Sequence, residues 1–539
     1  MATAERIDSK AENWFTSPTR ASSLTVGEMA FPDSLASLSR TQWISIVLTA
    51  ISAYLLARSI YNFYFHPLAK YPGPRLAAIS DLWIAYHSTA GKWPWALEAV
   101  IKKYGNVVRI GPNEVVFLEP QAFLDIHSAK RNLADTFTKT DVVEGLGDDD
   151  DGLLWERDPV KHRQAAKKMA HAFSAAAIKA KVPTINQHID YMIGKMRELG
   201  AAPEGVDLRQ WIEWLAMDLS ADLAYNYEMN QLKRMKNDPF LDMMHSASIL
   251  TTIIQVTKKY PFIAPISMLF LPWDVTRSLP SLIKDLRRGL ADRIAKRGNT
   301  RHLDYFEQLL PSDAPEPTTK EKRHMLTVTG QLIVGGFDPT STLFFMCMFF
   351  LIKNPDKMRL LVEEINAKFT SYDEIQPDAL VGFHYLNGCL QETLRLNATA
   401  VHHSLPRMSP GGVVNGEYIP KGTVCRTSLF AYGRSPRYWH DPLSFRPERW
   451  LPAGHARFDA AFANDDHSGH FPFITGPRQC PGREVARIET RLFITKMLWS
   501  FEIEPLDGVK KLDYERDFRV YSIWEKPEMR VRLLPVKRD

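Results

Sequence analysis

The stretch FPFITGPRQCPGRE, Phe471–Glu484, decides the fold class of this chain and places Cys480 between two glycines and two arginines. Gly476 and Gly482 let the backbone approach something flat and bulky, because glycine has no side chain. Pro481 suits the first turn of the strongly helical segment that follows. The backbone amides and the positive end of that helix favour a thiolate on Cys480.

The Cys480 thiol has two interpretations. A lone cysteine is usually an inert buried thiol, whereas a thiolate donates electron density to iron and, as a haem ligand, promotes O–O cleavage. Arg478 lies two residues before Cys480, in a position to meet an anionic group. The flanking residues therefore favour the haem ligand.

Composition excludes several classes of protein. Four cysteines in 539 residues, without regular spacing, indicate neither a disulfide framework nor a zinc site and are typical of a reducing compartment. The 67 basic and 62 acidic residues give a net charge of only +5, so we expect no nucleic-acid partner.

The N-terminal part predicts a membrane anchor. Trp43–Ala57 is uncharged and apolar, and the apolar pattern resumes after Arg58, so the run reaches about the 20 residues that cross a bilayer. A retained anchor is favoured over a cleaved signal peptide, with a buried or interfacial helix as the alternative. The predicted organisation is a polar, poorly ordered segment (1–42), a transmembrane anchor (43–65), a proline-rich hinge (66–80) and a catalytic domain (81–539).

Beyond about residue 80 the spacing of apolar residues is mostly helical. Short strand-like pieces interrupt it near Val107–Leu118 and Gly411–Leu429, and no repeat or long linker divides the chain. We therefore predict one large domain, mainly α with a small β region. The acidic run Asp148–Asp151 is predicted to be a solvated loop rather than a calcium site.

A long helix is predicted between the capping residues Thr318 and Thr319 and the stop at Asn354. Its roughly 35 residues span about 50 Å. Within it, Pro339 collides with the carbonyl group of the residue four positions earlier, so we expect a kink or an opening there. The alternative is a core helix with a tolerated kink, but Asp338 would then be an expensive buried carboxylate without a role.

The segment Leu390–Leu396 contains Glu392 and Arg395, which share a helix face three residues apart. Such a pair is common on solvated surfaces. Arg449, on a proline-stiffened loop, is a possible third member, and a buried glutamate with two arginines would pin that loop.

From about Pro67 to the C-terminus, the sequence resembles a eukaryotic microsomal cytochrome P450, a haem-thiolate monooxygenase. The family's haem-loop pattern F-x-x-G-x-R-x-C-x-G is matched by Phe473, Gly476, Arg478, Cys480 and Gly482. The chain also carries the family's E-x-x-R pair (Glu392, Arg395), its P-E-R loop with Arg449, and segments that resemble its propionate-binding regions at Arg407 and His162.

The resemblance implies a triangular, mainly helical prism fold with a small β region and haem b as the cofactor. It implies Cys480 as the axial iron ligand, with Phe473, Gly476 and Gly482 in the haem loop. His162, Arg407 and Arg478 would bind the propionates, and Glu392, Arg395 and Arg449 would lock together on the proximal side. Detailed similarity extends to filamentous fungal enzymes of secondary metabolism, the trichothecene hydroxylase type among them.

The chain departs from the family pattern twice. The family's helix motif A/G-G-x-D/E-T-T becomes Gly335 to Thr340 here, with Pro339 replacing the threonine that aids proton delivery to oxygen. Asp338 and Thr340 remain the candidate catalytic residues, although a one-residue offset turns a side chain by about 100°. The second departure is Ala166, where the family usually has an arginine four residues after the histidine.

The resemblance further implies hydroxylation or another oxidation of a hydrophobic metabolite by O2 and NADPH-derived electrons. The expected partners are NADPH-cytochrome P450 reductase and a bilayer, in a single-pass protein of the endoplasmic reticulum membrane with a cytosolic catalytic domain. A terpenoid or meroterpenoid substrate is favoured, with polyketides and alkaloids as alternatives. We expect two further groups of residues to contribute, one shaping the substrate pocket (Val401, His402, His403, Ser404) and one forming a basic proximal patch (Lys167, Lys168, Arg483, Arg487, Arg491).

Two other functions stay open. Because the oxygen-handling threonine is replaced by Pro339, the chain is also compatible with a haem-thiolate isomerase or dehydrase that works without external electrons. A catalytically idle haem protein, or an anchor protein without haem, is the remaining alternative.

Overall fold

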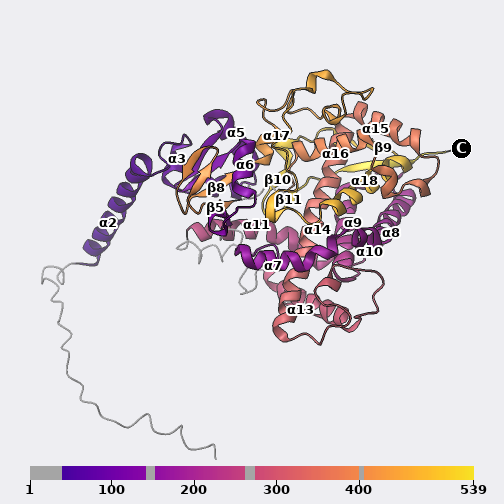
Figure 1. Ribbon diagram of the computed structural model, residues 1–539, viewed down its shortest axis with the longest axis horizontal. Helices are drawn as coiled ribbons and strands as arrows, with labels where there is room; N and C mark the ends of the chain where they lie inside the picture. Colours follow the sequence, from indigo (N-terminus) through magenta and orange to yellow (C-terminus); the bar gives the residue numbers. More distant parts are fainter. Residues whose placement is uncertain (1–38, 141–151, 261–272, 400–405, 539) are drawn as a thin grey trace, which may run out of the picture. The chain divides into compact units, whose positions relative to one another are not determined.

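The computed structural model describes residues 39–140, 152–260, 273–399 and 406–538 (Figure 1). Asp148–Asp151, the pocket candidates from Val401 to Ser404, and most of the predicted polar segment 1–42 lie outside the described residues. Packing divides the chain into two compact units, Met1–Arg58 and Ser59–Asp539.

Helix α2 (Arg40–Ile60) is apolar, and none of its residues is buried. With the short π-helical turn Tyr61–Phe65 it forms a run of 26 residues that contains an 18-residue window with a mean hydropathy of 1.6, long enough and apolar enough to cross a bilayer. Arg58 donates a hydrogen bond to the hydroxyl group of Tyr54, one turn earlier. Helix α14 meets the same length and composition criteria, but it is mostly buried and is a core helix.

The predicted long helix is confirmed as α14 (Thr319–Lys353), which has 35 residues. Thr318 and Glu321 form a capping box at its start, and Asn354 ends it. The helix runs continuously through Pro339, so the predicted opening is wrong. Its residues from Phe337 onward are almost all buried, and this packing supports the helix beyond the proline.

Helix α14 is the centre of the core in the larger unit. It packs against α9 (Leu208–Tyr225), α16 (His384–Leu396) and α18 (Arg483–Ser500) (Figure 1). The contact with α9 is close, because a Cβ added at Gly336 would lie 2.7 Å from the hydroxyl oxygen of Ser220. The remaining helices are α3 (Arg75–Ile79), α4 (Leu82–Thr89), α5 (Trp93–Tyr104), α6 (Pro120–His127), α7 (Pro159–Met169), α8 (Ala175–Leu199), α10 (Gln231–Arg234), α11 (Pro239–Lys259), α13 (Trp273–Ala295), α15 (Pro355–Lys368), α17 (Leu429–Gly433), α19 (Asp507–Lys510) and α20 (Tyr514–Asp517).

The sheets are small, as the strand-like pieces predicted. The largest has the strand order β1-β2-β8-β5-β3, in which only the β2–β8 pair is parallel. Its strands are β1 (Val107–Gly111), β2 (Glu114–Phe117), β3 (Thr138–Lys139), β5 (Arg407–Met408) and β8 (Val424–Thr427). The others pair β4 (Val206–Asp207) and β9 (Phe501–Pro505) with β12 (Arg530–Pro535), β6 (Gly412–Val414) with β7 (Glu417–Ile419), and β10 (Arg519–Val520) with β11 (Trp524–Glu525). The unit is therefore mainly helical with a small β region.

Candidate functional site

A hydrogen bond and two residues with positive φ fix the backbone of the cysteine loop. The amide of Cys480 donates to the carbonyl oxygen of Phe473 at 2.9 Å. Gly476 has a φ of 76°, and a Cβ there would collide with the carbonyl oxygen of His127. Ile474 has a φ of 59°, which is strained for a β-branched residue, and such strain clusters at functional sites.

The side chain of Cys480 is exposed at the start of α18. Gly482 is the N-cap of that helix, so Pro481 precedes the cap instead of occupying the first turn. Although this side chain is accessible, the protein atoms packed around it raise the pKa of the thiol above its ordinary value, against the lowering effects of the Gly482 amide and Arg483. The Gly482 amide and Arg483 thus favour the thiolate, as predicted, although they do not offset the effect of the surrounding protein.

Four basic side chains gather beside this loop: Lys139, His162, Arg407 and Arg478. Lys139 on β3 lies directly opposite Arg407 on β5, and residues paired in this way project from the same face of a sheet. Burial, with the charge of Arg478, lowers the pKa of Arg407 to about 9. Burial and the neighbouring arginines lower the pKa of Lys139 to about 6 and that of His162 to about 4.

Among the described residues, Glu156 and Asp158 act on this cluster only through longer-range electrostatics. Arg478 donates to the carbonyl oxygens of Glu156 and Arg157, Arg407 to that of Pro406, and Lys139 to that of Leu154. Within the described ranges, none of the four basic groups forms an ion pair with a carboxylate. Arg407 and Arg478 keep their charges at neutral pH, and Lys139 and His162 would regain protons beside an anion, so the cluster suits an anionic partner such as the two propionate groups of a haem.

One face of α14 is open. Gly335 is exposed, and no atom of the described residues lies within 4 Å of a Cβ placed on it. Pro339 follows four residues later and Leu332 precedes by three, so the three residues share one face, and both neighbours are only half-buried. A flat cofactor can approach the helix along this face.

The two candidate catalytic residues lie on different sides of α14. Asp338 accepts a hydrogen bond from the amide of Trp524 and a long one, 3.4 Å, from the hydroxyl group of Thr342. Thr340 instead donates to Glu489 on α18. Two residues correspond to about 200° of rotation, so the structure does not bring Asp338 and Thr340 together.

Glu489 is a buried acid that sequence reasoning missed. Burial raises its pKa to about 8, and the hydrogen bond from Thr340 only partly offsets that effect. The carboxyl group is therefore protonated at neutral pH. Its position on α18, nine residues after Cys480, gives little indication that the side chain is buried, because a glutamate in an amphipathic helix usually faces solvent.

Glu392, Arg395 and Arg449 form one buried network. Arg395 binds both carboxylate oxygens of Glu392, at 2.7 and 2.8 Å, and Arg449 approaches one of them at 3.1 Å. The indole group of Trp450 and the amide of Arg446 complete the set, at 2.9 and 2.8 Å. Burial alone would raise the pKa of Glu392, but the two guanidinium groups outweigh it and hold that pKa below its ordinary value.

The basic residues expected on the proximal surface differ in availability. Lys167 and Lys168 are exposed at the end of α7. Arg483 and Arg487 share Glu484, at 3.0 and 2.9 Å, and Arg491 donates to the side chain of Asn387. The free positive charge is therefore concentrated on α7.

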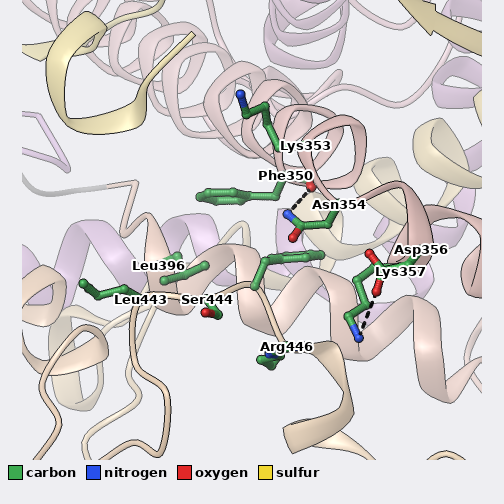
Figure 2. Close-up of a pocket in the computed structure, with 10 residues that line it drawn as sticks. Phe350, Lys353, Asn354, Asp356, Lys357, Leu396, Leu443, Ser444 and Arg446 are labelled. Atoms are coloured by element: carbon green, nitrogen blue, oxygen red, sulfur yellow. Dashed lines mark hydrogen bonds and ion pairs between the residues drawn. The ribbon is translucent and has the colours of Figure 1, made fainter. Parts of the chain in front are cut away.

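A cavity of about 310 Å³ lies at the far end of α14, lined by Phe350, Lys353, Asn354, Asp356, Lys357, Leu396, Leu443, Ser444, Phe445 and Arg446 (Figure 2). Phe350 follows Asp338 by twelve residues, so about 18 Å of helix separates this cavity from the motif Gly335 to Thr340. Its cations are engaged: Lys353 with backbone carbonyls, Lys357 with Glu448, and Arg446 with Asp441. None of the predicted site residues that the structure describes lines it.

Comparison with known proteins agrees with this geometry. The Cytochrome P450 family model matches residues 76–529. The chain is 43% identical to the cytochrome P450 monooxygenase TwmD of Talaromyces wortmannii, over 92% of this chain and 96% of the relative. It is 33% identical to the cytochrome P450 monooxygenase poxC of Penicillium oxalicum (92% and 95%) and 31% identical to BOA3 of Botryotinia fuckeliana (91% and 96%). The chain therefore belongs to the cytochrome P450 family and is a haem-thiolate monooxygenase.

Proposed function

We propose that this enzyme oxidises a hydrophobic fungal secondary metabolite, with Cys480 as the axial ligand of haem b. The observation that supports this assignment best is the basic cluster beside the cysteine loop, which forms no ion pair with a carboxylate of the described residues. Lys139, His162, Arg407 and Arg478 would hold the propionates, and Phe473, Gly476 and Gly482 would shape the loop against the macrocycle.

Bound haem supplies the iron at which O2 is activated. The protein's own contribution starts with the Glu392–Arg395–Arg449 network, which fixes the loop carrying Arg449. The open face at Gly335 and Pro339 admits substrate and cofactor side by side. Asp338 would relay protons with ordered water, because burial raises its pKa to about 6 and it can change charge near neutral pH.

The N-terminal helix supports a membrane location. We assign residues 43–65 as a single-pass anchor in the endoplasmic reticulum membrane, 66–80 as a hinge, and 81–539 as a cytosolic catalytic domain with the family's triangular prism fold. The support is the apolar run Arg40–Phe65, with none of its hydropathy window buried.

NADPH-cytochrome P450 reductase is the proposed electron donor. The exposed cations of α7, among them Lys161, Lys167 and Lys168, adjoin the residues whose carbonyl groups bind Arg478. A positive surface close to the haem edge would attract an acidic partner.

A terpenoid or meroterpenoid is the proposed substrate class, and its support is the similarity to fungal enzymes of the trichothecene hydroxylase type. The test is to produce the full chain with the reductase and supply terpenoid, polyketide and alkaloid scaffolds under ¹⁸O2. We expect one labelled oxygen atom in a terpenoid product. Labelled product from another scaffold only would overturn the substrate class, and unlabelled product would overturn the oxygenation.

A second function has one specific observation in its favour. Pro339 occupies the position of the usual threonine, and Thr340 is engaged with Glu489. An isomerase or dehydrase would keep turning over without NADPH and reductase. A monooxygenase would stop, so omitting both components decides between the two.

A further inference from the structure

Lys526 is a buried cation in the segment after β11. Only 1% of its side chain is exposed, and its ammonium group lies 3.3 Å from Oε1 of Glu213 on α9. It also contacts the hydroxyl group of Ser341 on α14, again at 3.3 Å. Lys526 therefore joins three segments that are far apart in the sequence.

Asp338 lies on the same side of α14 as this lysine. It precedes Ser341 by three residues, which puts both on one helix face. The amide of Trp524, two residues before Lys526, donates to the Asp338 carboxylate. Asp338 is thus held against the segment that carries Lys526, and both Lys526 and Glu213 lie within electrostatic range of it.

The ion pair continues toward the surface. Oε2 of Glu213 lies 3.2 Å from Nε2 of His245 on α11, whose side chain is 34% exposed. Arg209 on α9 also acts on Glu213. The charged groups that act on Asp338 are thus Lys526, from the segment after β11, and Glu213, from α9. Glu213 is in turn acted on by His245 from α11 and Arg209 from α9.

We propose that the buried ion pair Lys526–Glu213 controls the charge state of Asp338, which makes both members positioning residues for the oxidation. Asp338 is the acid to which the proposed function assigns proton delivery, so this inference rests on that function. Neither Lys526 nor Glu213 belongs to a motif of the sequence, and they act through Asp338 rather than on the substrate.

The two members act on Asp338 with opposite signs. Burial raises the pKa of Asp338 to about 6, Lys526 lowers it, and Glu213 raises it. Removing the Lys526 charge should therefore raise this pKa, and removing the Glu213 charge should lower it. If Lys526 and Glu213 only supported the fold, replacing them would not shift the pKa of Asp338 in opposite directions.

The experiment titrates Asp338 directly in the resting, haem-loaded full chain. The infrared C=O stretch of the protonated carboxyl group is followed against pH, and the spectrum of Asp338→Asn is subtracted to isolate it. We expect Lys526→Met to move the midpoint up by about one pH unit and Glu213→Gln to move it down by a similar amount. The matched control Lys526→Arg keeps the charge and should restore the parent midpoint.

Midpoints that stay unchanged, or that move the same way in Lys526→Met and Glu213→Gln, would overturn the inference. If Lys526→Met does not fold, Glu213→Gln still decides through the sign of its shift. Coupling is measured in parallel as H2O2 released per NADPH consumed. If the infrared midpoints move as expected and the pH profile of coupling does not follow, the ion pair stands and the proposed role of Asp338 in proton delivery fails.

Discussion

Replacing Lys139 with methionine tests the proposed propionate site. The substitution keeps most of the side-chain stem and removes the amino group opposite Arg407. An ordinary lysine pKa of 10.5 falls to about 6 at this position, first through burial and then through Arg478 and Arg407. At pH 7 the folded, haem-free protein therefore holds Lys139 as a neutral amine.

The magnitude follows from that pKa. Loss of the proton at pH 7 costs about 1.4 kcal/mol for each pH unit below 10.5, or about 5 kcal/mol. This destabilisation is largest below pH 6 and disappears as the pH rises to 10.5. We therefore expect Lys139→Met to stabilise the haem-free protein at pH 7, by up to that amount.

In the haem-loaded enzyme we expect Lys139→Met to be destabilising, the opposite of its effect on the haem-free protein. A propionate beside Lys139 would restore the charge of this lysine, so haem binding would take up a proton between about pH 6 and the higher pKa of the complex. Haem affinity would then fall as pH rises through that window. A charged hydrogen bond contributes about 1.5–3 kcal/mol, so Lys139→Met should weaken haem binding about 10- to 100-fold and flatten the pH dependence.

The assay is the transfer of haem to an excess of a haem-scavenging globin, followed by absorbance from pH 6 to pH 9. Lys161→Met, which removes an exposed lysine of α7, is the matched control and should behave like the parent. Equal haem retention and an equal pH slope in Lys139→Met and the parent would refute the propionate site.

Three further substitutions probe the rest of the structure. Gly476→Ala should largely prevent haem incorporation, because the added Cβ would collide with the carbonyl oxygen of His127 at a position with positive φ. The haem-to-protein ratio of the purified variant measures this effect, and full haem loading would contradict it. Glu392→Gln leaves two buried guanidinium groups without their carboxylate and should cost about 3–5 kcal/mol, read as a lower thermal midpoint, with the exposed Glu363→Gln as control. Glu489→Gln should stabilise the protein by about 3 kcal/mol at pH 7, because the pKa of Glu489 rises from 4.5 to about 8 and neutralising it in the fold costs about 1.4 kcal/mol per pH unit above 4.5. That gain should vanish near pH 4.5, and a gain independent of pH in unfolding titrations would show that Glu489 is ionised in the folded protein.

The sequence by itself determined the features that depend on residues close together in the chain. The cysteine loop, the capped 35-residue helix and the i,i+3 pair Glu392–Arg395 are local patterns, and helix geometry or turn chemistry translates them directly into structure. The same locality explains one error. Pro339 predicts an opening when taken alone, and the continuous burial of α14 after it overrides that preference.

Only the tertiary structure decided which charges meet. Lys139 and Arg407 are 268 positions apart and become neighbours through the β3–β5 register, while Lys526, Glu213 and Asp338 come from three separate segments. The partners that Asp338 and Thr340 meet likewise depend on what packs on each side of α14. Long-range electrostatics is set by packing, and no local pattern records which distant side chain will lie 3 to 4 Å away.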